Sequence, residues 1–187
     1  MQYLDEKCGK YFRFRDFIEC GETHAGTSLS NVPTQAETYN ALTRLATLIL
    51  DPVIDYFGPI VLTYGFCSRE LAKNIPGRTT PALDQHASCE RNTRGKPICP
   101  RGGAAVDFIV TDESMLEVAQ WIVQHTPFDR LYFYSDKRPL HVSYGPGNKG
   151  ETILMRELGN GRSIPQVVKR EVFVKSSGWK TLMKAKE

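Results

Sequence analysis

The sequence has no long apolar run, no apolar leader and no strong excess of charge of one sign. Its uninterrupted apolar stretches are only a few residues long, whereas a membrane-spanning helix needs about 20, so we expect no membrane partner. The first residues are polar and acidic, so no secretory signal is expected and the predicted location is cytoplasmic. A formal net charge of +3 is compatible with an anionic partner but is far below that of most nucleic-acid-binding proteins.

The chain also has few cysteines, and they do not form the usual zinc-binding pattern. There are five, an odd number, and no Cys-x-x-Cys pair occurs among them. In a chain without a secretory signal, most of them are expected to be reduced thiols. Cys89 and Cys99 lie in the same polar segment, and the sequence leaves open whether they form a disulfide or hold a second metal.

What is present is an ordinary globular composition, with 41% hydrophobic and 24% charged residues in a length that suits one domain. Apolar periodicity predicts a long helix over residues 39–57, with Thr34 and Glu37 as its capping box. β-Branched or alternating runs predict strands, and shorter periodic segments predict further helices. The expected strands are 59–64, 104–110, 131–134 and 140–144, and the expected short helices are 69–74 and 114–125.

These elements predict an α+β fold in which a small antiparallel sheet is flanked by helices. A polar turn joins strands 131–134 and 140–144, which favours an antiparallel hairpin. Residues 79–103 are polar and rich in proline and glycine, and loops of this length are often functional. Residues 167–174 are predicted as an edge strand. A basic tail follows it, with Trp179, Lys180, Lys184 and Lys186.

Only four histidines occur, and two of them lie where strands and loops are expected to converge. His86 lies in the long loop, and His141 alternates with apolar neighbours in a predicted strand. Asp107 lies in a strand that is otherwise expected to be buried, and a buried carboxylate needs a compensating charge. Two imidazoles, one carboxylate and a water are a common ligand set of catalytic zinc. From spacing alone two alternatives stay open: each histidine as an ordinary core or surface group, and Asp107 paired with Arg101.

Three short motifs connect this pattern with a known family. They are Asp84-Gln85-His86, Gly103-Ala104-Ala105-Val106-Asp107-Phe108, and Phe128-Asp129-Arg130-Leu131 followed by Leu140-His141-Val142-Ser143-Tyr144. From about residue 12 to 155 the chain resembles the zinc D-Ala-D-Ala carboxypeptidases and peptidoglycan endopeptidases of the Hedgehog/DD-peptidase fold, particularly the small phage-type members. The resemblance implies a phage-encoded protein, a Zn2+ ion held by His86, Asp107 and His141, and a cell-wall peptide as substrate.

The chain departs from the family pattern by an insertion between the first two ligands. The expected arrangement is a zinc peptidase-like domain over residues 1–160 with the insertion at 87–102, and then a C-terminal strand and basic tail over 161–187. The insertion is predicted to form a lid or rim beside the metal, where Arg101 is a candidate contact for the substrate. Its basic residues are Arg91, Arg94, Lys96 and Arg101.

Three replacements change the expected catalytic residues. Where the family has an arginine for the substrate carboxylate, the chain has Cys67, so Arg69 becomes the candidate for that contact. Where phage-type members have a glutamate as general base, the chain has Tyr134, a candidate substrate contact. Asp136 is the nearest carboxylate, and Asp84 replaces the family's serine near the first ligand, so both are candidate general bases.

The leading hypothesis is therefore a zinc-dependent hydrolase that cleaves an amide bond in a cell-wall peptide or another small anionic substrate. A second hypothesis keeps the fold but binds or processes a nucleotide or nucleic acid, with the basic insertion on the phosphates and Tyr64, Phe66 and Tyr134 against a base. A third is a non-catalytic phage structural module that retains only the zinc.

Overall fold

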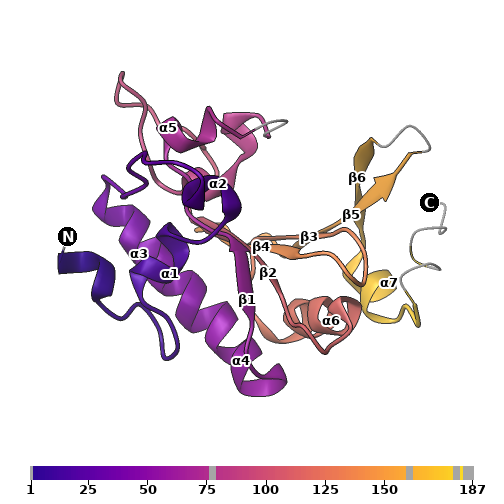
Figure 1. Ribbon diagram of the computed structural model, residues 1–187. Coiled ribbons are helices and arrows are strands. Elements are labelled where there is room, and N and C mark those ends of the chain that lie inside the picture. Colours follow the sequence, from indigo (N-terminus) through magenta and orange to yellow (C-terminus); the bar gives the residue numbers. More distant parts are fainter. Residues whose placement is uncertain (1, 76–78, 159–161, 179–181, 183–187) are drawn as a thin grey trace.

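Figure 1 shows the computed structural model, in which a central β-sheet has its longest helices packed on one side. The structure describes residues 2–75, 79–158, 162–178 and 182. The α-helices are α1 (Phe14–Ile18), α2 (Glu22–Ala25), α3 (Ala36–Leu45), α4 (Asp51–Phe57), α5 (Arg69–Ala72), α6 (Met115–His125) and α7 (Arg170–Val174). The strands are β1 (Val61–Tyr64), β2 (Ala104–Ile109), β3 (Arg130–Phe133), β4 (Leu140–Tyr144), β5 (Glu151–Glu157) and β6 (Ser163–Val168). Short 3-10 turns are η1 (Gln2–Asp5), η3 (Pro81–Leu83) and η4 (Gln85–Ala87).

The six strands form one sheet in the order β1-β2-β4-β3-β5-β6. The α+β class and the antiparallel pairing of β3 with β4 are confirmed. The sheet is nevertheless mixed and not wholly antiparallel, because β3 and β5 run parallel. In the part of the chain that the structure describes, no helix has the length and apolarity needed to cross a membrane.

The alternation of side chains along the strands gives the sheet two different faces. One face is apolar and packs against α3 and α6. The residues on it are fully or almost fully buried: Val106, Phe108, Leu131, Phe133, Leu140, Val142 and Leu154. The intervening positions of the same strands include Asp107, Tyr132 and His141, so polar side chains collect on the opposite face.

The long predicted helix is built from α3, a π-helical turn η2 (Ala46–Leu50) and α4. Pro52 lies in the first turn of α4, where a residue without an N–H is tolerated. The carboxylate of Asp51 accepts hydrogen bonds from the backbone N–H groups of Lys10 (2.7 Å) and Tyr11 (3.3 Å). This contact fastens the N-terminal segment to the helix.

The predicted capping box of this helix is wrong, because the cap comes from the insertion. The buried Glu90 carboxylate accepts the backbone N–H groups of Thr34 (3.0 Å) and Gln35 (3.1 Å) and the hydroxyl of Thr38 (2.9 Å). An anion at a helix N-terminus is favoured by the helix dipole and by the free N–H groups. The insertion is therefore anchored to α3, and Glu37 stays exposed.

The C-terminal part differs from the prediction in its boundaries. The edge strand β6 begins at Ser163 and ends at Val168, and residues 170–174 form helix α7 in place of a continued strand. β6 pairs along its length with β5. The expected boundary at residues 160 and 161 and four residues of the basic tail (Trp179, Lys180, Lys184 and Lys186) lie outside the described residues.

Candidate metal centre

The structure brings the three expected ligands together from two strands and a loop. Asp107 in β2 and His141 in β4 are direct cross-strand partners on the polar face of the sheet. His86 lies in η4, at the start of the insertion, and its carbonyl accepts the backbone N–H of Cys67 at 2.9 Å. Together they are a group that could hold a metal ion.

The separations of the three ligand atoms suit a tetrahedral ion. His141 Nδ1 lies 2.8 Å from Asp107 Oδ1. His86 Nε2 lies 3.1 Å from His141 Nδ1 and 3.3 Å from Asp107 Oδ1. Tetrahedral zinc, with bonds of about 2.0–2.2 Å to nitrogen and oxygen, places neighbouring ligand atoms about 3.3 Å apart.

The hydrogen bond behind His86 decides which of its ring nitrogens faces the other ligands. His86 Nδ1 lies 2.8 Å from the carbonyl oxygen of Gly65, which can only accept, so Nδ1 carries the proton. In the neutral ring, Nε2 therefore presents a lone pair toward Asp107 and His141. Fixing a ligand's tautomer through its second nitrogen is a common feature of metal-binding histidines.

The electrostatics of the centre favour a cation among these atoms. Burial opposes charge on His86, but the nearby Asp107 carboxylate raises the pKa of the imidazole overall. Burial also opposes ionisation of Asp107, and the two imidazoles overcome it and hold the pKa of the carboxyl below its usual value. A proton and a metal ion therefore compete for the same position, as expected for ligands that bind metal only when deprotonated.

Tyrosine side chains pack around the two imidazoles. The Tyr64 ring lies 4.3 Å from that of His86, and the Tyr132 ring meets that of His141 edge-on at 5.1 Å, both between centroids. Burial raises the pKa of Tyr64, and mainly burial raises the pKa of Tyr134 to about 12. The phenols of Tyr64 and Tyr134 are thus neutral near pH 7 and can donate hydrogen bonds.

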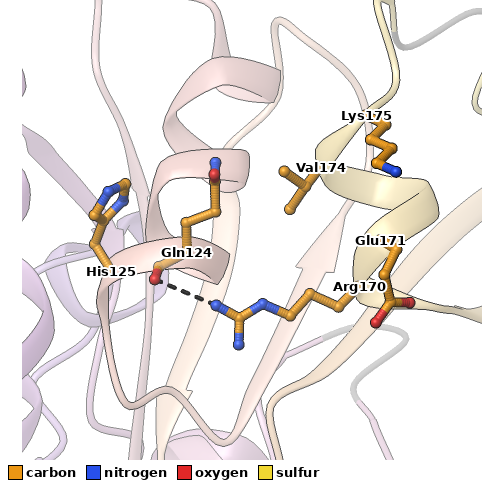
Figure 2. A pocket seen from close by; sticks show the side chains of 6 residues that line it. All are labelled: Gln124, His125, Arg170, Glu171, Val174 and Lys175. Atoms are coloured by element: carbon orange, nitrogen blue, oxygen red, sulfur yellow. Dashed lines mark hydrogen bonds between the residues drawn. The ribbon is translucent and has the colours of Figure 1, made fainter.

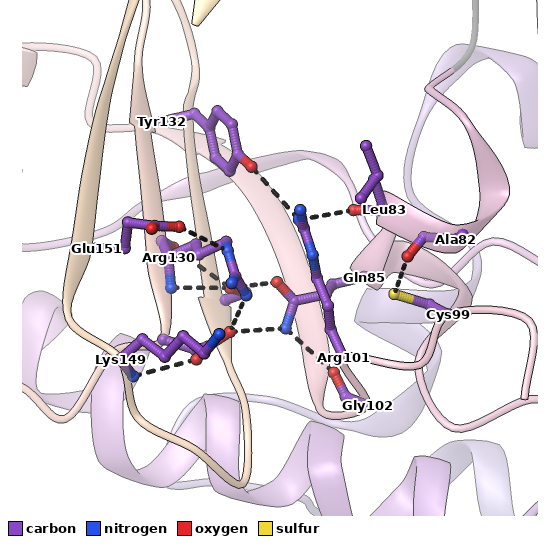
Figure 3. A network of polar contacts seen from close by, with 12 residues as sticks. Ala82, Leu83, Gln85, Cys99, Arg101, Gly102, Arg130, Tyr132, Lys149 and Glu151 are labelled. Carbon is purple, nitrogen blue, oxygen red and sulfur yellow. Dashed lines mark hydrogen bonds and ion pairs between the residues drawn. The ribbon is translucent and has the colours of Figure 1, made fainter. Parts of the chain in front are cut away.

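Gln85 connects the loop that carries His86 with the sheet (Figure 3). Its Nε2 donates to Asp129 Oδ2 and to the carbonyl of Gly102, both at 3.1 Å. Its Oε1 accepts the hydroxyl of Ser143 at 3.0 Å. These buried contacts hold the backbone on both sides of the insertion close to β4.

The same network contains a buried ion pair (Figure 3). Arg130 Nη1 lies 2.7 Å from Asp129 Oδ2, and Arg130 Nε lies 2.9 Å from Glu151 Oε2. The other oxygen of Asp129 accepts the backbone N–H of Lys149 at 3.1 Å. Charges are compensated here, which is the condition for burying an ion pair.

The metal centre opens into a cavity of about 460 Å3 between the polar face of the sheet and the loop before η4. Two of the candidate substrate contacts, Arg101 and Tyr134, line this cavity, and so does the candidate base Asp84. Arg101 Nη1 donates to the carbonyl of Leu83 at 3.0 Å and to the Tyr132 hydroxyl at 3.4 Å. Its guanidinium is therefore held at the wall of the cavity.

The other two candidates lie elsewhere. The Asp136 carboxylate accepts the Ser114 hydroxyl (2.6 Å) and the backbone N–H of Leu116 (3.0 Å), so it caps α6 and does not line the cavity. Arg69 is exposed at the start of α5 and faces two other surface hollows. Of the two candidate bases, Asp84 is the one beside the ligands, and its Oδ1 accepts the backbone N–H of His86 at 3.1 Å.

The insertion places its basic and sulfur-containing residues apart from each other. Its tip is a turn closed by a bridge between Arg91 and Pro97, and the side chains of Arg91, Arg94 and Lys96 are exposed there. Arg101 is the one residue of the predicted basic group that lines the cavity. Cys89 and Cys99 are free thiols, so the disulfide, one of the two alternatives that the sequence left open, is wrong. Within the described ranges, His86, Asp107 and His141 form the sole metal-type cluster, so no second one includes these cysteines.

A further pocket lies between α6 and α7 (Figure 2). Its lining side chains are Gln124, His125, Arg170, Glu171, Val174 and Lys175. Arg170 Nη2 donates to the carbonyl of Gln124 at 3.2 Å across its floor. The pocket offers a single histidine and a single carboxylate, so it lacks the converging ligands of the metal centre.

Several residues of the site were not found from the sequence. Gln85 lies next to His86, but its partners Asp129 and Ser143 are about 40 to 60 positions away, so no local pattern reveals the contacts. Tyr132 is easier to predict as a site residue, because it lies opposite His141 in the predicted hairpin. Cross-strand pairing alone would have placed it at the site.

Comparisons with known proteins do not extend these observations. No protein-family model matches the chain, and neither the curated proteins nor the solved structures give a significant match.

Proposed function

We propose that the protein is a zinc-dependent hydrolase that cleaves an amide bond. The observation that carries the proposal is the convergence of His86 Nε2, Asp107 Oδ1 and His141 Nδ1 at the wall of an open cavity. When bound there, zinc would polarise a carbonyl group and make water more acidic. A purely structural site usually has four protein ligands, whereas this group supplies three.

The remaining roles fall to residues that line the cavity. Asp84 would accept the proton of the attacking water, because its carboxylate lies beside the ligands and its Oδ2 accepts no hydrogen bond from a described residue. Tyr134 would donate a hydrogen bond to the oxygen on which negative charge develops. Arg101 would bind an anionic group of the substrate. The proposed substrate class, a cell-wall peptide, rests on the sequence resemblance.

The proposal is tested with purified peptidoglycan and metal-loaded protein, by measuring released amino groups. Replacing Asp84 with asparagine should lower the rate by about 100-fold to 10,000-fold and leave the zinc content unchanged. The matched control is Asp112→Asn, because Asp112 is exposed in a turn outside the cavity. A protein that binds one zinc ion but releases no amines, beside an active endopeptidase control, would leave the non-catalytic module as the better account.

A further inference from the structure

The cavity of the metal centre extends across the whole sheet and is not confined to the ligands. Every strand contributes a residue to its lining: Tyr64 (β1), Asp107 (β2), His141 (β4), Tyr132 (β3), Met155 (β5) and Pro165 (β6). Neighbouring strands lie about 4.8 Å apart, so the three steps from β4 to β6 span roughly 14 Å. The ligands lie toward one end, and a long part of the cavity runs from them to the edge strand.

The pairing register confirms that these residues share one face. Tyr64 is opposite Asp107, Asp107 is opposite His141, and His141 is opposite Tyr132, so they form a row across four strands. On β5 the residue opposite Tyr132 is Ile153, and Met155 lies two positions further along the same face, opposite Pro165 of β6. Partners directly opposite each other project to the same side of a sheet.

The side chains that line the cavity change from polar to apolar between β4 and β6. Arg101 lies above Tyr132, one strand beyond His141, and its guanidinium forms no ion pair with any residue that the structure describes. It is half-buried, and a partly desolvated cation is stabilised by an anionic partner. Beyond it, Met155 is half-buried and Pro165 exposed, and both offer apolar surface.

We propose that Arg101, Tyr132, Met155 and Pro165 form a substrate-binding subsite, which we call the distal groove. It binds an extended peptide segment that places a carboxylate at Arg101 and an apolar side chain over Met155 and Pro165. At about 3.3 Å per residue, 14 Å accommodates about four residues. The inference deepens the proposed function, because the hydrolysed bond would lie at the metal centre and the distal groove would select the sequence beside it.

The distal groove gives the C-terminal part of the chain a role in recognition. Pro165 belongs to β6, which pairs only with β5 among the described strands. A proline in an edge strand removes one N–H that another chain could use for sheet pairing. Pro165 is also exposed and lines the cavity, so its ring offers apolar contact to a ligand that lies across the strands.

The test uses peptide hydroxamates, whose head group binds zinc, in two series with the head group at the carboxyl or the amino end. Acetohydroxamate reports the metal centre alone, and calorimetry gives the affinity of each longer probe for the zinc-loaded protein. In the series whose chain direction matches that of the bound substrate, a glutamate near the head group should tighten binding about tenfold or more. A leucine beyond it should add up to about tenfold. Arg101→Gln should remove the first gain, and Met155→Ala should reduce the second.

The matched control is Arg91→Gln, which changes an exposed arginine of the same insertion and should leave both gains intact. If acetohydroxamate binds but neither series gains affinity with length, or the gains survive both substitutions, the distal groove is wrong and the metal centre stands. If acetohydroxamate does not bind, the metal centre is wrong. The distal groove is then decided with the same peptides as simple amides: binding that Arg101→Gln weakens supports it, and no such dependence overturns it.

Discussion

Two polar clusters lie next to each other on the same face of the sheet, and they differ in how their hydrogen-bonding groups are matched. Around Asp129 and Arg130, hydrogen-bond donors face acceptors: the Arg130 guanidinium donates to the Asp129 carboxylate, and Gln85 both donates and accepts. Around His86, Asp107 and His141, three atoms that each present a lone pair once deprotonated face one another at 2.8–3.3 Å. One proton can satisfy only part of this second arrangement.

The difference separates a cluster that stabilises the fold from one that is built to bind. A buried network with matched donors and acceptors needs nothing further. A cluster of acceptors is completed by a cation from outside. Gln85 belongs to the matched cluster, and the next residue, His86, is a ligand of the other. The hydrogen bonds of Gln85 therefore hold His86 in position.

The largest expected effect comes from breaking the matched cluster. Arg130→Met should lower the free energy of unfolding by about 3–5 kcal/mol, because the buried Asp129 carboxylate loses its ion pair. Urea denaturation measures the loss. The matched control is Arg138→Met, which breaks the exposed pair with Glu157 and should cost less than about 1 kcal/mol. Equal losses in the two variants would contradict the assignment of the buried pair as structural.

The next effect concerns the acceptor cluster. Asp107→Asn should weaken zinc binding by more than about 100-fold, because even the loss of a residue that only supports a ligand costs 10- to 100-fold. Competition with a chromophoric chelator measures the affinity. Asp112→Asn, the exposed control, should bind as the unmodified protein does. If Asp107→Asn keeps full affinity, the carboxylate is not a ligand.

A smaller effect tests the anchoring of the insertion beside the two clusters. Glu90→Gln should lower the free energy of unfolding by about 1–2 kcal/mol, because α3 loses its charged cap. Zinc affinity should stay close to that of the unmodified protein. Glu37→Gln, at the capping position that the sequence suggested, should change stability by less than about 0.5 kcal/mol. A larger effect at Glu37 than at Glu90 would contradict the observed cap, and thermal or urea denaturation decides between them.

The smallest effect is a pH dependence whose sign should differ between the metal-free and the zinc-loaded protein. Without metal, the raised pKa of His86 contributes stability below its unfolded pKa of about 6.5, and that contribution is lost as the pH rises through the folded pKa. With zinc in fixed excess, stability should instead rise over the same interval, because protons leave the ligands. Melting temperatures between pH 6 and 8 measure both slopes, and slopes of the same sign would contradict proton–metal competition at His86.

Local sequence patterns were sufficient for most of the framework. The alternation of Leu140, His141 and Val142 places the histidine on the face opposite the core, and the small apolar run before Asp107 predicts its strand. From spacing alone other interpretations of these two positions and of His86 stay open, and the ligand group is predicted only through the resemblance to the zinc peptidases. The α+β class follows from the same periodicities.

What the sequence did not reveal depends on distant contacts. Glu90 caps a helix more than 50 positions away, which no local capping pattern can indicate. The parallel pairing of β3 with β5 is a tertiary choice, and β5 itself was not predicted. Asp136 was favoured as a base by its closeness in sequence to His141, but the turn after β3 directs it to the N-terminus of α6. Asp84, in the loop before η4, lines the cavity instead.

The central claim is that His86, Asp107 and His141 hold one metal ion, and anomalous diffraction at the zinc absorption edge tests it most directly. Crystals of the zinc-loaded protein should show one anomalous peak about 2.0–2.2 Å from His86 Nε2, Asp107 Oδ1 and His141 Nδ1. The peak should be absent from crystals of His141→Ala prepared in the same way. No peak at these three atoms in the unmodified protein, or a peak that persists there in His141→Ala, would contradict the account.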